Sequence, residues 1–133
     1  MPGSRERADG GTGERATVLV VDDDPEIRQT IQWTLEDEGF AVETAADGRE
    51  ALRRAELRRP ALVILDWGLP GLSGEGFASL LRTAHGDSVP IVLITADGRA
   101  AEKARRVRAQ DYLHKPFELD DLVSMVRRGL DAG

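Results

Sequence analysis

Short apolar runs alternate with amphipathic stretches along most of the chain, from Ala16 to about Leu130. Two of the runs, Val-Leu-Val-Val at 18–21 and Leu-Val-Ile-Leu at 62–65, are apolar without alternation. This pattern is typical of strands that are buried on both faces of a parallel sheet. The predicted strands are Thr17–Val21, Phe40–Ala45, Leu62–Leu65, Ile91–Thr95 and Asp111–His114.

Apolar residues at helical spacing fill the segments between and after these strands and predict helices there. Pro25, the capping-box pair Asp47 and Glu50, and Ser73 mark the starts of the first three. The apolar positions are, helix by helix, Ile27, Ile31 and Leu35; Ala51, Leu52 and Ala55; Phe77, Leu80 and Leu81; Ala101, Ala104 and Val107; and Leu119, Leu122, Val123, Val126 and Leu130. The fourth helix, at about Arg99–Arg108, has little apolar surface to bury, so we expect it to be held weakly.

Strict alternation of strands and helices with short loops requires right-handed crossovers. It predicts an α/β fold, a doubly wound five-stranded parallel sheet with helices on both faces. Ligands of such sheets bind beyond the carboxyl ends of the strands. Residues 1–15 mix glycine with charged residues and lack an apolar period, which predicts a flexible N-terminal tail before a single folded domain at 16–133.

Charge and composition narrow the range of functions. A net charge of -6 argues against a broad basic face for nucleic acid. The sequence contains no cysteine, which excludes disulfides, thiolate metal sites and cysteine nucleophiles. No apolar run is long enough to span a bilayer or to act as a signal peptide, so we expect a cytoplasmic protein without membrane contact.

Acidic side chains follow two of the predicted strands. Asp22, Asp23 and Asp24 come directly after the first strand, and Asp66 follows the third. If the sheet has the strand order 2-1-3-4-5, these two strands are neighbours, and Asp22, Asp23 and Asp66 converge. Two carboxylates about 4 Å apart repel by roughly 4 kcal/mol at an effective dielectric of 20. Such a cluster requires a cation, and Mg²⁺ suits oxygen ligands that are shared with a phosphate.

Two further strand ends supply groups that bind anions. Thr95 ends the fourth strand with a hydroxyl, and Lys115 follows the fifth with a positive charge. Pro116 predicts a rigid or cis turn that aims this lysine inward. Together these groups favour binding of a tetrahedral anion beside a carboxylate nucleophile. Attack by Asp66 on phosphorus would form an aspartyl phosphate.

Four stretches of the sequence resemble, in order and spacing, the signature blocks of bacterial response-regulator receiver domains. They are Val18–Pro25, Leu62–Gly71, Leu93–Ala96 and Asp111–Phe117. The resemblance extends over Thr17 to about Leu130, essentially the whole predicted domain. It implies a flavodoxin-like receiver fold and a single-domain, two-component signalling protein.

The resemblance also implies roles for individual residues. Asp66 would be the phosphoacceptor in a phosphorelay, and Lys115 would hold the phosphoryl group. Asp23 would be a direct magnesium ligand, Asp22 would help through water, and Gly68 would contribute its backbone carbonyl. Such a protein is not an enzyme, because it catalyses only its own phosphorylation and dephosphorylation.

Switching and partners follow from the same resemblance. Thr95 would swing toward the phosphoryl group, and Tyr112 would turn inward on activation. The phosphodonor would be a sensor histidine kinase or a histidine phosphotransfer protein, and a downstream protein would be the target, with no nucleic acid. Homodimer formation is left open, because Arg108 stands where many receiver domains carry glycine and the fourth helix is expected to be short, shifted or mobile.

The same residues also have purely structural interpretations. An Asp-Asp-Asp run alone is more often a solvated loop or a helix cap, and Tyr112 is equally well a plain half-buried aromatic. Trp33 lies off the apolar face of its helix, which predicts an exposed ring and suggests contact with the phosphodonor. His85 and His114 are expected to face solvent.

Two other functions compete with the switch. One is a phosphorylation-independent interaction module on the same fold. The other is a phosphatase of the haloacid-dehalogenase type, because Asp22 and Asp24 form an Asp-x-Asp pair after a buried strand.

Overall fold

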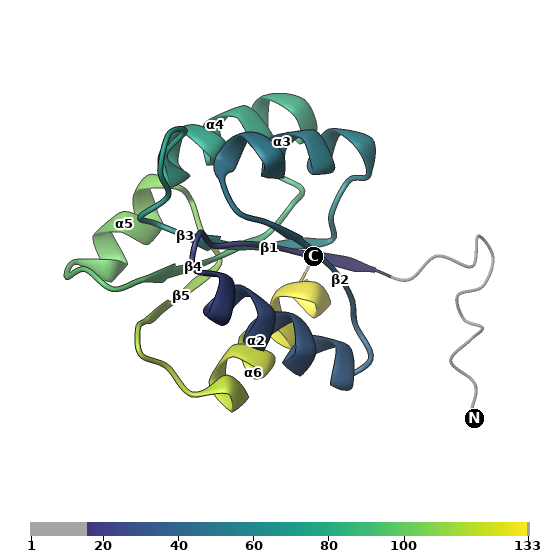
Figure 1. Ribbon diagram of the computed structural model, residues 1–133. Helices are drawn as coiled ribbons and strands as arrows, with labels where there is room; N and C mark the ends of the chain where they lie inside the picture. The colour runs from purple at the N-terminus through teal and green to yellow at the C-terminus, as the bar shows by residue number, and fades with distance from the viewer. Residues whose placement is uncertain (1–15, 133) are drawn as a thin grey trace.

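The structure is a computed structural model that describes residues 16–132, so the tail predicted for residues 1–15 lies outside it. Strands and helices alternate throughout (Figure 1). The elements are β1 (Thr17–Val21), α2 (Pro25–Asp37), β2 (Ala41–Ala45), α3 (Gly48–Leu57), β3 (Leu62–Asp66), α4 (Gly74–His85), β4 (Ile91–Thr95), α5 (Ala100–Arg106), β5 (Asp111–His114) and α6 (Leu119–Ala132).

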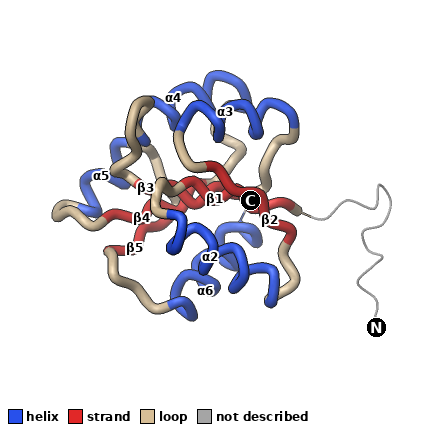
Figure 2. The backbone as a smooth tube through the Cα atoms, viewed as in Figure 1, coloured by secondary structure: helices blue, strands red, loops and turns tan. Residues whose placement is uncertain are grey.

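The five strands form one parallel sheet in the order β2-β1-β3-β4-β5, which confirms the predicted fold class. Figure 2 shows α3, α4 and α5 on one face of this sheet and α2 and α6 on the other. Successive residues of each strand pack alternately into the core on the two faces of the sheet. Leu19 and Val21 pack under α3 and α4, whereas Val18 and Val20 pack against α2 and α6.

The predicted helix starts are confirmed by their hydrogen bonds. Asp47 accepts a hydrogen bond from the Glu50 backbone N–H at 2.8 Å, and Ser73 accepts one from Gly76 N–H at 3.0 Å. The Glu50 side chain accepts one in return from the Ala46 N–H, at 2.9 Å. Among the described residues, no helix has the length and apolar character that crossing a membrane requires.

Three predicted side-chain positions are wrong. Leu80 is 46% exposed, because the buried stripe of α4 follows Phe77 and Leu81 and leaves Leu80 at its edge. Ala101 is exposed, since α5 contacts the core through Ala104. His85 is half-buried, with Nε2 3.1 Å from the Ala55 carbonyl oxygen, whereas His114 is exposed as predicted.

The helix expected to be weakly held is α5, and it is short. It has seven residues, and its N-cap residue, Arg99, makes no capping hydrogen bond through its side chain. Arg99 and Arg108 both have left-handed backbone, with φ of 62° and 54°. Ala104 in α5 and Val107, directly after the end of α5, are buried. The chain thus enters and leaves α5 in conformations that suit glycine better than arginine.

A side chain of α4 compensates at the C-terminal end of α5. The Arg82 guanidinium donates hydrogen bonds to the carbonyls of Val107 and Arg108, at 3.0 and 2.8 Å. It also donates to the Val89 carbonyl before β4, at 3.1 Å. Burial, together with the charge of Arg108, lowers the pKa of Arg82, although Asp87 opposes this shift. Arg82 therefore joins three segments through its fixed fork of donors.

We expect Arg82→Lys to lower the free energy of unfolding by roughly 2 kcal/mol, because one ammonium group cannot reach all three carbonyls. Urea denaturation followed by circular dichroism measures the change. The matched control is Arg105→Lys on the exposed side of α5, which should change stability by less than about 0.5 kcal/mol. Equal effects of the two substitutions would contradict this role of Arg82.

Candidate functional site

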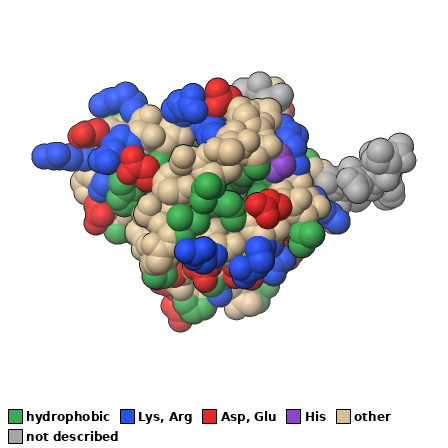
Figure 3. Space-filling model, turned by 90° about the horizontal axis from the view of Figure 1, so that it is seen from above, with side chains coloured by type: hydrophobic (Ala, Val, Ile, Leu, Met, Phe, Trp, Pro, Cys, Tyr) green, Lys and Arg blue, Asp and Glu red, His purple; other side chains and the backbone are tan. Residues whose placement is uncertain are grey.

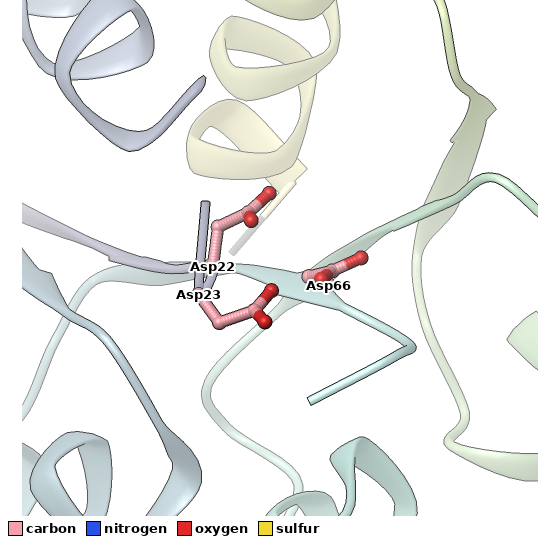
Figure 4. A group of neighbouring side chains, drawn as sticks. All are labelled: Asp22, Asp23 and Asp66. Atoms are coloured by element: carbon pink, nitrogen blue, oxygen red, sulfur yellow. The ribbon is translucent and has the colours of Figure 1, made fainter. Parts of the chain in front are cut away.

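Three aspartates meet at the carboxyl end of the sheet. One carboxylate oxygen of each aspartate lies within 4.8 Å of the corresponding oxygens of the other two. Asp22 is fully buried directly after β1, Asp66 ends β3 and is 6% exposed, and Asp23 is exposed. Figure 4 shows the three side chains beside one another. The convergence predicted from the sequence is therefore confirmed.

Strand register brings these residues together. Val21 of β1 pairs with Leu65 of β3, so the next residue on each strand is an aspartate. The buried Asp22 is held in place, since its Oδ1 accepts a hydrogen bond from the Asp24 backbone N–H at 2.9 Å. Its carbonyl oxygen accepts another from Arg28 at 2.8 Å.

Asp24 has a different role from its two neighbours. Its carboxylate accepts hydrogen bonds from the backbone N–H groups of Glu26 and Ile27, at 2.9 and 3.3 Å, and so caps the start of α2. The structural interpretation of the acidic run, a helix cap, is therefore correct for Asp24.

Lys115 lies between the two buried carboxylates. Its Nζ is 3.0 Å from Asp22 Oδ2 and 3.3 Å from Asp66 Oδ1. The peptide bond to Pro116 is cis, one of the two turn geometries expected there. The Lys115 backbone N–H donates to the Thr95 carbonyl at 2.7 Å, which ties the loop after β5 to the end of β4.

The charges in the site shift two pKa values. Burial and the charge of Asp22 raise the pKa of Asp66 above its ordinary value, although Lys115 and a backbone hydrogen bond from Gly68 oppose this. Burial acts to lower the pKa of Lys115, but the hydrogen bond and charge of Asp22, together with Asp66, outweigh it and raise that pKa. Lys115 therefore stays positively charged, but its single charge does not neutralise the negative charge of the carboxylates around it.

The other predicted site residues lie at different distances from this cluster. Thr95 is 1% exposed, and its Oγ1 accepts a hydrogen bond from the Asp97 N–H at 3.1 Å. Gly68 is exposed and contacts the Asp66 carboxylate through its backbone. Tyr112 lies on the edge strand β5 and is 40% exposed, so much of its ring is at the surface.

Sequence reasoning did not single out the contacts of Trp67, the residue after Asp66. The centre of its ring is 5.5 Å from Lys103 Nζ and 5.9 Å from Arg106 Cζ. Both cations belong to α5 and are three residues apart, so they lie on one face of the helix. That spacing is the only signal in the sequence, and it does not identify the ring that the two cations face.

The donor set fits a hard divalent cation. Carboxylate oxygens are the ligands that Mg²⁺ prefers, and a cluster of three carboxylates with one lysine carries an excess of negative charge. Oxygens within 4.8 Å of one another can share one ion with water in the remaining positions. Asp22, Asp23 and Asp66 are therefore suited to hold magnesium.

Known proteins of one family resemble this chain in sequence. The sequence matches the family described as "Response regulator receiver domain" over residues 18–127. It is 40% identical to Response regulator MprA of Mycolicibacterium vanbaalenii over 112 residues, which cover 83% of this chain and 48% of that protein. DNA-binding response regulator MtrA of Mycolicibacterium smegmatis is 39% identical over 118 residues, covering 87% and 51%.

Solved structures show the same fold. Chemotaxis protein CheY4 of Vibrio cholerae superposes with a TM-score of 0.81 at 38% identity, covering 88% of this chain and 100% of that chain. The receiver domain of NtrX from Brucella abortus gives 0.80 at 36% identity, covering 87% and 99%.

This chain belongs to the response regulator receiver domain family and is a receiver domain of two-component signalling. Receiver domains are generally switches rather than enzymes, and they bind Mg²⁺ at an acidic pocket. The chain spans about half the length of the curated relatives it matches.

Asp66→Asn should raise the free energy of unfolding by about 1 kcal/mol at neutral pH without divalent metal, because it removes a buried charge that Asp22 repels. A raised pKa means that the folded wild type binds this proton more readily than the unfolded chain. The wild-type penalty is therefore present above that pKa and is relieved as the pH falls through it.

Denaturant unfolding at several pH values measures this difference. Asp37→Asn, an exposed position in α2, is the control and should leave stability within about 0.5 kcal/mol at every pH. A less stable Asp66→Asn protein at neutral pH would show that Lys115 already neutralises the cluster.

Proposed function

We propose that the protein is a phosphorylation-controlled switch that accepts a phosphoryl group on Asp66 from a histidine kinase or a histidine phosphotransfer protein. One observation carries the proposal. Lys115 Nζ bridges the buried Asp22 and Asp66 carboxylates at 3.0 and 3.3 Å, at the edge where Asp23 completes the acidic cluster. A nucleophilic carboxylate, a metal site and an anion-binding cation thus occupy the same place.

The transfer is a substitution at phosphorus. A carboxylate oxygen of Asp66 forms the new bond to phosphorus while the bond from phosphorus to the donor's histidine nitrogen breaks, and the bonding electron pair stays on that nitrogen. Lys115 leaves part of its contact with Asp66 and holds an oxygen of the arriving group. Thr95, buried at the end of β4, donates a hydrogen bond from its hydroxyl group to another oxygen.

Asp22, Asp23, Asp66 and the Gly68 carbonyl would hold the magnesium ion. When bound, the ion neutralises charge on the phosphoryl oxygens. After transfer, movement of Thr95 toward the phosphoryl group makes room for Tyr112 to turn inward. The changed surface then binds a downstream protein.

An apolar groove of about 520 Å³ beside Lys115 supports a protein phosphodonor. It is lined by Ile27, Thr30, Ile31, Ala96, Lys115, Pro116, Phe117 and Leu119. A partner seated on it would present its phosphohistidine next to the lysine that faces Asp66. Trp33 is exposed, as its helical position predicts, and its contact with the donor stays a prediction.

The competing functions gain no support from the site. A haloacid-dehalogenase-type phosphatase needs both carboxylates of the Asp-x-Asp pair in its site, but the Asp24 carboxylate caps the start of α2. A phosphorylation-independent module would be favoured by loss of an acidic or lysine position, and Asp22, Asp23, Asp66 and Lys115 are all present. One relative is described as a DNA-binding response regulator, so the expectation of no nucleic acid is proposed only for the receiver domain.

Incubation with Mg²⁺ and acetyl phosphate tests the proposal by intact mass. We expect one added phosphoryl group on the wild type and none on Asp66→Asn. Asp23→Asn should react at least about tenfold more slowly, because it removes a metal ligand. Chelation of the metal before the donor is added should block the wild-type reaction.

The Asp37→Asn variant is the matched control and should react like the wild type. An unmodified wild-type protein, or a phosphoryl group on Asp66→Asn, would contradict the proposed function.

A further inference from the structure

Cations are concentrated at α5, and one of them is largely covered. Figure 3 shows Lys and Arg side chains at the left end of the molecule, where α5 lies in Figure 1. The side chain of Arg106 is 55% exposed and Arg105 is exposed, but the side chain of Lys103 is only 16% exposed. A lysine covered to this extent exchanges hydration for protein contacts.

The contacts of Lys103 lead into the loops that follow β3 and β4. Its Nζ faces the Trp67 ring at 5.5 Å, donates a hydrogen bond to the Gly98 carbonyl at 2.9 Å, and is 3.4 Å from Asp97 Oδ2. The ammonium group thus connects one residue of the β3–α4 loop with two residues of the β4–α5 loop.

Both loops begin at a residue of the acceptor site. Trp67 directly follows Asp66, and its N–H donates to the Ile94 carbonyl at 2.9 Å. The Asp97 N–H donates to Thr95 Oγ1 at 3.1 Å and so occupies an acceptor position of that hydroxyl. The hydroxyl proton of Thr95 is thereby directed elsewhere, since a hydroxyl has one proton and two lone pairs.

We propose that Lys103 is a positioning residue for phosphoryl transfer, which fixes the Asp66 and Thr95 loops relative to each other through Trp67 and Asp97. This inference rests on the proposed function. Lys103 acts through the two loops and not on the phosphoryl group. The short helix α5 contributes only Ala104 to the buried core, so it has little apolar area to hold it in place. The cation–π contact and the charged hydrogen bond of Lys103 supply that anchoring.

The test compares Lys103→Met, Lys103→Arg and Arg105→Met. All are made in a Trp33→Phe background, so that Trp67 is the only tryptophan and reports on its own surroundings. Two quantities are measured: the Mg²⁺ concentration at half-saturation, from Trp67 fluorescence, and the rate constant of phosphorylation by saturating acetyl phosphate with saturating Mg²⁺, from intact mass.

We expect the Lys103→Met rate constant to fall about tenfold while the half-saturating Mg²⁺ concentration changes by less than about twofold, because misplaced reacting groups slow transfer without removing a metal ligand. Lys103→Arg, which keeps a cation over the ring, should return to within about threefold of the wild type. Arg105→Met should match the wild type.

A second variant tests whether Lys103 acts through Trp67. Trp67→Leu removes the ring but leaves α5 unchanged, and we expect it to slow transfer as well. The double variant with Lys103→Met should then be slowed by less than the product of the two single effects.

The outcomes distinguish this inference from the function on which it rests. Wild-type phosphorylation together with an unchanged Lys103→Met rate constant would overturn the role of Lys103 and leave the switch intact. Failure of Lys103→Arg to restore the rate, or two single effects that multiply in the double variant, would overturn that role as well. A wild type that accepts no phosphoryl group would overturn both proposals.

Discussion

Two buried carboxylates on neighbouring strands, offset by one lysine, are the constraint on which the rest of the site depends. Asp22 and Asp66 are 0% and 6% exposed, and Lys115 contacts both. Without the lysine, their repulsion at about 4 Å would amount to roughly 4 kcal/mol at an effective dielectric of 20. The fold places the three groups together, because β1 and β3 are adjacent and the loop after β5 returns toward the end of β4.

This arrangement leaves an excess of negative charge around Asp66. The raised pKa of Asp66 reflects burial and Asp22, which Lys115 offsets only in part. A divalent cation would offset the remaining negative charge, and in the proposed function a phosphoryl group would complete its coordination. The same site is next to α5, which contributes one residue to the buried core. Arg82 connects the end of this helix with α4, and Lys103 connects it with the loops after β3 and β4. A change of charge at Asp66 would therefore occur close to a helix with little buried apolar area.

The sequence predicts the sheet and the acidic cluster because both follow from local patterns. Unbroken apolar runs, alternation with helices and right-handed crossovers lead to a doubly wound parallel sheet. The order 2-1-3-4-5, one of the common orders of such sheets, then brings Asp22, Asp23 and Asp66 together. Contacts between distant segments are not predictable in this way. Arg82 reaches Val107 and Arg108, 25 and 26 residues away, and nothing in the local sequence indicates it. The half-buried His85 and the cations over Trp67 were missed for the same reason, and Leu80 and Ala101 were misplaced because spacing does not reveal how wide a buried stripe is.

The central claim is that Asp66 itself carries the phosphoryl group. The most direct measurement is borohydride reduction of the phosphorylated protein followed by peptide sequencing in the mass spectrometer, since an acyl phosphate is reduced to an alcohol. We expect homoserine at position 66 and unmodified aspartate at positions 22 and 23. Homoserine at another aspartate, or a phosphoryl group on His114 that borohydride leaves unchanged, would contradict the claim.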